Sequence, residues 1–115
     1  MGRFVKGDVV VVPFPFSDLS GSKRRPAFVL ADLPGDDVIL CQITSQQVKD
    51  RFSVPLSSVD FAKGSLPVSS NIRPNRIFTA DKNIIIKKSG TVKTEVIQKV
   101  LQVITDIFEI TLFFI

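Results

Sequence analysis

Short runs of hydrophobic residues predict β-strands along the first two thirds of the chain. Strand-like segments are expected at residues 8–14, 27–32, 38–44, 51–55 and 69–79. The runs at residues 9–12 and 38–43 are apolar almost without interruption, which indicates strands buried on both faces. Residues 34–37 read Pro-Gly-Asp-Asp and predict a turn between the second and third strands. Pro67 and Pro74 cannot donate to a ladder, so we expect them at edges or bends.

The last third of the chain changes to a helical period. Apolar residues fall three and four positions apart, at Val96, Ile97, Val100, Leu101, Ile104, Ile107 and Phe108. This spacing predicts an amphipathic helix over residues 94–108, with Gly90 ending the segment before it. The apolar tail at residues 111–115 is compatible with an added strand, a cap on the sheet or a subunit contact.

Together these patterns predict a mainly β protein, built as a small, strongly bent antiparallel sheet or barrel with a C-terminal helix. A length of 115 residues fits a single domain spanning residues 1–115, and 44% apolar residues can bury a core. No apolar run reaches the roughly 20 residues that span a bilayer, and the N-terminus does not resemble a signal peptide. We expect a soluble, cytoplasmic protein that does not bind membranes.

The net charge and the amino-acid composition limit the kinds of catalytic and metal-binding site that the chain can form. The net charge of +4 permits a polyanionic partner without demanding one. The chain has no histidine, which removes His-based triads and His-ligated metals, and its acidic residues are too scattered for a two-metal nuclease. Its one cysteine, Cys41, lies in an apolar run and is expected to be a buried structural residue. No cofactor or metal site is expected.

The strongest candidate for a binding site is a polar loop between the first two strands. It carries Ser20 and three consecutive cations, Lys23, Arg24 and Arg25, followed by Pro26. Guanidinium groups hold phosphates through paired hydrogen bonds, and hydroxyls orient them. Other cations and hydroxyls, at Thr44 and Arg73, follow or lie within later strands. The sequence therefore predicts a phosphate-binding surface that works without metal.

Six short motifs in order along the chain resemble the PemK/MazF family of type II toxin–antitoxin toxins. They are Gly7-Asp8-Val9-Val10, the loop at residues 16–26, Ile43-Thr44-Ser45, Gly64-Ser65-Leu66-Pro67, Ser70-Asn71-Ile72-Arg73 and Gly90-Thr91-Val92. The resemblance runs from about residue 6 to residue 108. Each motif alone is weak, whereas the ordered set is specific.

The resemblance implies an SH3-like β-barrel with a C-terminal helix, acting as a homodimer. It implies a metal-independent, sequence-selective endoribonuclease, or mRNA interferase, that cleaves single-stranded RNA. It also implies a cognate antitoxin whose acidic C-terminal segment covers the RNA groove, and DNA binding by the toxin–antitoxin complex.

The resemblance implies functional residues only at positions of this chain that match the family's motifs. Arg25 matches the family's catalytic arginine and Thr44 its catalytic threonine, whereas Ser45 and Gln46 lie where the family contacts substrate. Arg73 matches an arginine that some members use in cleavage. Those members place an aspartate two residues later and a histidine in the first loop. This chain has Asn75 and no histidine, so the resemblance favours a site based on arginine and threonine.

Further substrate contacts are expected from the loop and from two aromatic residues. Ser20, Lys23 and Arg24 would steer or hold the RNA backbone, and Phe16 and Phe52 would stack on bases. Each has an ordinary structural alternative, because small barrels bury aromatic residues in the core and surface cations are usually solvated. Arg73 has the alternative of an ion pair with a carboxylate such as Asp81.

The expected reaction is attack by the ribose 2′-hydroxyl on the adjacent phosphate, giving a 2′,3′-cyclic phosphate or 3′-phosphate and a 5′-hydroxyl. Arg25 would neutralise developing charge and, secondarily, protonate the leaving oxygen, while Thr44 fixes the phosphate. The general base is left unassigned. Two alternatives use the same fold without catalysis: a gyrase-binding toxin of the CcdB type, and an SH3-like module that binds an acidic peptide.

Overall fold

The computed structural model describes residues 4–15 and 22–113. Within these residues seven strands form one sheet in the order β4-β6-β3-β2-β1-β7-β5, and every pairing is antiparallel. The strands are β1 (Asp8–Pro15), β2 (Ser22–Asp32), β3 (Asp37–Thr44), β4 (Val54–Leu56), β5 (Phe61–Gly64), β6 (Ser70–Asp81) and β7 (Lys87–Val92). Two short 3₁₀ helices, η1 (Ser58–Asp60) and η2 (Lys82–Ile84), and the helix α1 (Thr94–Phe113) complete the described elements.

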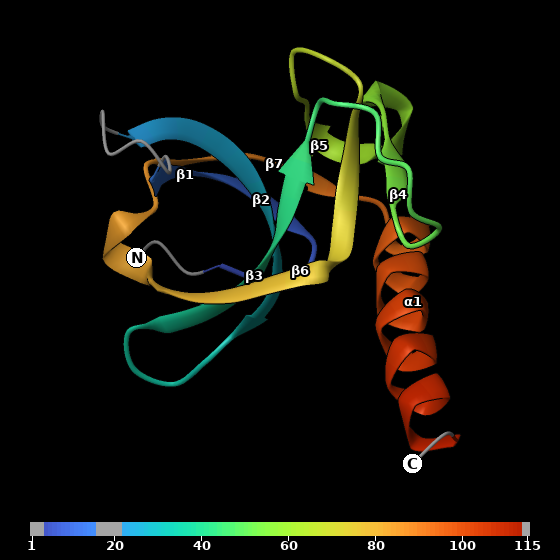
Figure 1. The fold of residues 1–115 in the computed structure, drawn as a ribbon. Helices are drawn as coiled ribbons and strands as arrows, with labels where there is room; N and C mark the ends of the chain where they lie inside the picture. The colour runs from blue at the N-terminus through green and yellow to red at the C-terminus, as the bar shows by residue number, and fades with distance from the viewer. Residues whose placement is uncertain (1–3, 16–21, 114–115) are drawn as a thin grey trace.

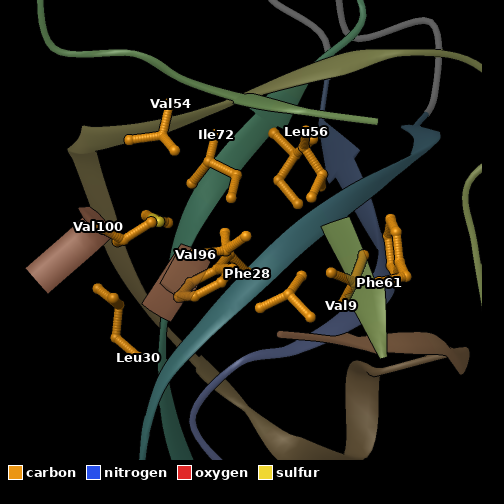
Figure 2. Packing of buried hydrophobic residues seen from close by; sticks show 12 residues of the cluster. Val9, Phe28, Leu30, Val54, Leu56, Phe61, Ile72, Val96 and Val100 are labelled. Carbon is orange, nitrogen blue, oxygen red and sulfur yellow. The ribbon is translucent and has the colours of Figure 1, made fainter. Parts of the chain in front are cut away.

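The sheet curls strongly, and α1 lies alongside it (Figure 1). One face of the sheet and the first turns of α1 enclose a core that includes Phe28, Ile72, Val96 and Val100 (Figure 2). The opposite face has a second core that contains Val10, Val12, Val29, Val38 and Leu40. Neighbouring residues of one strand enter different cores, so the uninterrupted apolar runs are explained by burial on both faces. The predicted mainly β fold, with a bent antiparallel sheet and a C-terminal helix, is confirmed.

The helix is longer than its spacing predicted. α1 begins at Thr94 as expected but runs to Phe113, five residues beyond the predicted end at residue 108. Residues 111–113 therefore continue the helix rather than adding a strand, which removes one of the roles considered for the tail; residues 114–115 lie outside the described part. Within that part of the chain, no helix has the length and apolarity needed to span a bilayer.

The sequence pattern did not predict the strands β5 and β7, because both are short, contain lysine and glycine, and lack a run of apolar residues. Gly90 was expected to end a segment, but it lies inside β7. A Cβ on Gly90 would come within 2.4 Å of the Lys63 carbonyl oxygen on β5, so glycine permits the two strands to approach. β7 pairs with β1 on its other side, and that pairing makes it a strand despite its lysines.

Pro74 lies at a break in the β3–β6 ladder, as expected for a proline within a strand. The register passes from the pair Gln42–Arg73 directly to the pair Cys41–Ile77, so residues 74–76 of β6 have no partner in the ladder. A proline, which lacks the N–H, is tolerated at such a bulge. The resulting bend places Arg73 just before the irregular segment, at one end of the regular ladder.

A buried carboxylate connects the start of β1 to β7. Asp8 is 0% exposed, and its side chain accepts hydrogen bonds from the Val5 backbone N–H at 2.9 Å and the Thr91 hydroxyl at 2.8 Å. Lys88 adds an ion pair at 3.3 Å. Gly7, just before it, has φ +96°, and a Cβ there would lie 2.5 Å from the Ile97 side chain. The motifs Gly7-Asp8 and Gly90-Thr91 thus meet in space and hold the sheet together.

Candidate active site

The candidate site lies in a fork between β2 and β3. Within the described residues the ladder between these strands reaches only as far as the pair Ala27–Gln42. Beyond this pair β2 continues toward Arg25 with β1 as its neighbour, while β3 continues toward Thr44 with β6 as its neighbour. The two strands diverge, so Arg25 and Thr44 stand on opposite arms of the fork. Pro26 is compatible with this position because β2 has only one ladder there.

The structure corrects one expectation about this region. The sequence placed Lys23, Arg24 and Arg25 in a loop before a strand beginning at residue 27, but β2 begins at Ser22, so all three cations lie in a strand. The first half of β2 pairs with β1 alone, so it is less buried than the second half and its residues are polar. A polar sequence does not predict a strand. Successive side chains of a strand point to opposite faces of the sheet, so the side chains of Arg24 and Arg25 leave β2 in different directions.

A cavity of about 270 Å³ opens at the fork. Phe14, Arg25, Gln42, Ile43, Thr44, Gln46 and Arg73 line it. Both arginines and the threonine that were predicted to act on phosphate therefore face one space, although they come from three different strands. No carboxylate is among the described residues that line it, so its polar lining consists of cations, a hydroxyl and amides. Such a cavity suits a phosphate group.

The two arginines of the cavity differ in their partners. Arg73 Nη2 donates to Asp50 Oδ2 at 2.9 Å, which confirms the alternative of an ion pair with a carboxylate, although the carboxylate is Asp50 and not Asp81. Arg25 is half-buried, and within residues 4–15 and 22–113 it makes no ion pair. The guanidinium of Arg25 therefore keeps its donors for an incoming anion, whereas that of Arg73 is already held in place by a carboxylate.

Thr44 is oriented by the turn that follows β3. Its Oγ1 accepts a hydrogen bond from the Gln46 backbone N–H at 3.1 Å. The side chain of Asn71, which is opposite Thr44 in the ladder, donates to the Gln46 carbonyl oxygen at 3.2 Å. Because the threonine hydroxyl accepts in this turn, its own proton can be donated to a phosphate oxygen. The carboxamide of Asn71 thus fixes the backbone that presents Thr44 and Gln46.

The remaining predicted site residues are distributed around the fork. Arg24 and Ser45 line a second cavity beside the first, and Arg25 lines both. Lys23 is exposed on β2. Phe52 lines neither cavity; the Arg51 guanidinium carbon lies 5.5 Å from the centre of its ring. Phe16 and Ser20 lie outside the described residues.

Asp50 does not line the cavity but holds Arg73, and it was not predicted. Its Oδ1 accepts from the Phe52 backbone N–H at 2.9 Å, and its Oδ2 accepts from Arg73. The backbone N–H of Phe52 contributes most to holding the pKa of Asp50 below its ordinary value, followed by Arg73 and then Asn75. No local motif identifies Asp50, since its partner Arg73 is 23 residues away. Asn75 stands where some family members have an aspartate, and its side chain is a hydrogen-bond partner of the Asp50 carboxylate.

The Asp50 interactions predict a pH-dependent contribution to stability. A lowered folded-state pKa means that the carboxylate stabilises the folded chain above its ordinary pKa of 3.8. That contribution is lost as the pH falls through the folded-state value. We expect Asp50→Asn to be less stable than the wild-type chain at pH 6, and the difference to shrink below pH 3.8. Urea unfolding of both proteins between pH 6 and pH 2.5 measures it; a difference independent of pH would contradict the assignment.

Two observations concern the cysteine and the potential metal ligands of the described residues. Cys41 is buried, and burial raises the pKa of its thiol to about 12, which makes it a structural residue as expected. Within residues 4–15 and 22–113, no group of three or more His, Cys, Asp or Glu side chains is arranged to hold a metal ion.

Comparison with known proteins adds a family and a fold. Residues 5–108 match the family model described as PemK-like, MazF-like toxin of type II toxin-antitoxin system. No curated protein sequence matches the chain at a significant level.

Among solved structures, three likenesses bear on the fold. MazE–MazF from Deinococcus radiodurans (Form-III) is 20% identical with a TM-score of 0.74, covering 93% of this chain and 97% of that one. An endoribonuclease in complex with its cognate antitoxin from a Mycobacterial species is 14% identical with a TM-score of 0.72, covering 90% and 92%. The Mycobacterium tuberculosis toxin MazF-mt6 is 15% identical with a TM-score of 0.66, covering 87% and 96%. At these identities the likeness establishes the fold.

Proposed function

We propose that this chain, which belongs to the PemK-like, MazF-like family of toxins of type II toxin–antitoxin systems, is a metal-independent, sequence-selective endoribonuclease acting on single-stranded RNA. The observation that carries the proposal is the fork itself. Arg25 and Thr44 face one cavity from two diverging strands, together with Arg73 and without a carboxylate among its described lining residues. The endoribonuclease from a Mycobacterial species shares the fold, which supports the same class of activity.

The proposed reaction is an internal transesterification. The ribose 2′-oxygen forms a bond to the adjacent phosphorus while the bond from phosphorus to the 5′-oxygen breaks. The 2′-hydroxyl gives up its proton to a base, and the 5′-oxygen takes up a proton as it leaves. The products are a 2′,3′-cyclic phosphate, or the 3′-phosphate formed by its hydrolysis, and a 5′-hydroxyl. The requirement for the 2′-hydroxyl selects RNA over DNA.

Each side chain at the fork has a defined part in this reaction. Arg25 donates to the non-bridging phosphate oxygens, whose negative charge grows in the transition state. A guanidinium group is a weak proton donor, so electrostatic stabilisation is its main role and protonation of the 5′-oxygen its second. Thr44 donates its hydroxyl proton to the same phosphate and fixes its orientation. Arg73, held by Asp50, adds positive charge at the edge of the cavity.

Asp50 is a poor candidate for the general base. The Phe52 N–H and Arg73 already occupy its two oxygens and lower its pKa, which weakens it as a proton acceptor. Asp50 is instead a positioning residue for Arg73. The general base is left unassigned.

The proposed partners follow from the charge of the site. Arg24, Arg25, Arg73 and Lys87 surround the two adjoining cavities, so an acidic C-terminal segment of a cognate antitoxin would compete with RNA for the same surface. Complexes of MazE with MazF and of a Mycobacterial endoribonuclease with its antitoxin support this partner class. We also propose that the toxin acts as a homodimer.

The experiment that tests this function is incubation of a long single-stranded RNA with the protein in excess EDTA. We expect cleavage at a limited set of sequences, with 5′-hydroxyl ends and cyclic or 3′-phosphate ends. A strict requirement for Mg²⁺, or products with 5′-phosphates, would contradict the mechanism. Toxicity without any RNA cleavage would instead favour the non-catalytic gyrase-binding alternative.

A further inference from the structure

Four polar side chains share one face of the β3–β6 ladder at the fork. The register pairs Gln42 with Arg73, and two positions farther along it pairs Thr44 with Asn71. Paired residues, and alternate residues of one strand, point to the same face of a sheet. Gln42, Thr44 and Arg73 line the 270 Å³ cavity, but Asn71 does not. The side chain of Asn71 is instead turned to the segment that follows β3.

The segment that follows β3 has no ladder to hold it. Residues 45–53 connect β3 to β4 and form neither strand nor helix. Its first contact is a turn closed by a side chain, in which the Gln46 N–H donates to Thr44 Oγ1 at 3.1 Å. This bond is exposed to water, and a threonine hydroxyl closes such turns only weakly. By itself the turn would leave the Thr44 hydroxyl free to change its direction.

Two side chains of β6 tie this segment down from the same face. Asn71 Nδ2 donates to the Gln46 carbonyl oxygen at 3.2 Å. Farther along the segment, Arg73 Nη2 donates to Asp50 Oδ2 at 2.9 Å. Of the two bonds, the one from Asn71 bears on Thr44, because it holds the carbonyl group of the residue whose N–H binds the threonine hydroxyl.

The direction of the Thr44 hydroxyl decides whether it can serve the phosphate. A hydroxyl has one proton to donate, and the oxygen of Thr44 already accepts from Gln46. While this bond holds, the proton remains for an acceptor in the cavity. Rotation of the side chain to another staggered position would break the bond to Gln46 and take the hydroxyl from its place in the cavity.

We infer that Asn71 is a positioning residue for Thr44: by holding the Gln46 carbonyl oxygen, its carboxamide keeps the Thr44 hydroxyl aimed at the phosphate. This inference rests on the proposed ribonuclease function and adds a residue that acts on the chemical step without contact with the substrate. Loss of the Asn71 carboxamide should therefore slow cleavage of bound RNA and leave the binding of RNA almost unchanged.

A double-mutant cycle between Asn71 and Thr44 tests this inference. Asn71→Leu keeps the size of the side chain and removes its donor, so it should lower the single-turnover rate at saturating enzyme by about tenfold. The enzyme concentration that gives half of this rate should change by less than about twofold. In Thr44→Val, which has no hydroxyl to aim, Asn71→Leu should lower the rate by less than about twofold. The matched control Asn83→Leu, at an exposed asparagine of η2 that lines neither cavity, should leave the rate unchanged in both proteins.

Asn71→Asp repeats the measurement with the shape of the side chain kept. A carboxylate cannot donate to the Gln46 carbonyl oxygen, so the rate at saturating enzyme should again fall by about tenfold or more. Urea unfolding midpoints show which of the variants are folded and comparable.

The outcomes separate this inference from the proposed function. If the wild-type protein cleaves RNA and Asn71→Leu slows cleavage equally with and without the Thr44 hydroxyl, Asn71 does not act through Thr44. The inference is then overturned while the ribonuclease function stands. A loss confined to RNA binding, or an unchanged rate in both Asn71 variants, overturns it as well. If the wild-type protein cleaves no RNA, the proposed function fails and this inference fails with it.

Discussion

Replacing Arg25 by alanine should lower RNA cleavage by about a hundredfold to a thousandfold. Among the described residues Arg25 lies in the fork without an ion-pair partner, so its guanidinium is free to bind the phosphate as charge develops. Its removal deletes an electrostatic contact that grows in the transition state, so kcat should fall more than KM rises. Single-turnover cleavage of a fixed RNA, with excess enzyme, measures the chemical step directly.

Arg24→Ala is the matched control for Arg25→Ala. Both arginines are on β2 and carry the same charge, but Arg24 lines only the second cavity. Arg24→Ala should weaken RNA binding and its salt dependence while leaving the single-turnover rate at saturation within about threefold of the wild type. Equal losses of that rate in both variants would show that Arg25 acts only as part of a general positive field. Full activity in Arg25→Ala would exclude it from catalysis.

Replacing Asp8 by alanine should lower the free energy of unfolding by about 3 kcal/mol. The substitution removes a fully buried acceptor of two hydrogen bonds and leaves the Thr91 hydroxyl and the Val5 N–H without their partner. The estimate is at the low end for a buried ion pair because the Lys88 side chain is 43% exposed and can be hydrated. For a chain whose stability is on the order of 5–15 kcal/mol, this is a large fraction. Urea unfolding of both proteins measures it.

Two further variants separate the parts of this contribution. Asp8→Asn keeps an oxygen for Thr91 but loses the attraction to Lys88, so it should cost less than Asp8→Ala. Thr91→Val removes a single donor and should cost about 1 kcal/mol. A loss below about 1 kcal/mol in Asp8→Ala would show that the Asp8 contacts do not stabilise the sheet.

Local pattern predicted the strands whose side chains fill the cores and missed the strands that depend on their neighbours. The runs beginning at residues 8, 27 and 38 became β1, part of β2 and β3, because burial on both faces demands apolar residues. β7 contains Lys87, Lys88 and Gly90, so it has no apolar run; it is a strand because it pairs with β1. The early half of β2 was missed for the same reason.

In the candidate site, too, some residues could be predicted from the sequence and others depend on contacts made only in the folded chain. A resemblance of short motifs placed Arg25, Thr44 and Arg73, and the structure brings all three to one cavity although 48 residues separate the first from the last. Asn71 belongs to the motif Ser70-Asn71-Ile72-Arg73, but no role could be assigned to it from the sequence. Its contact with the Gln46 carbonyl oxygen depends on the register between β3 and β6. Asp50 carried no signal, because only the folded chain brings it to Arg73.

The central claim is that the fork promotes attack by a ribose 2′-hydroxyl on the phosphate held at Arg25 and Thr44. The most direct measurement uses two oligonucleotides of the mapped cleavage sequence, one entirely RNA and one with a single 2′-deoxyribose on the 5′ side of the cleaved phosphate, both in excess EDTA. We predict cleavage of the first, with cyclic phosphate and 5′-hydroxyl ends, and no cleavage of the second at that bond. Cleavage of both at similar rates would contradict the mechanism.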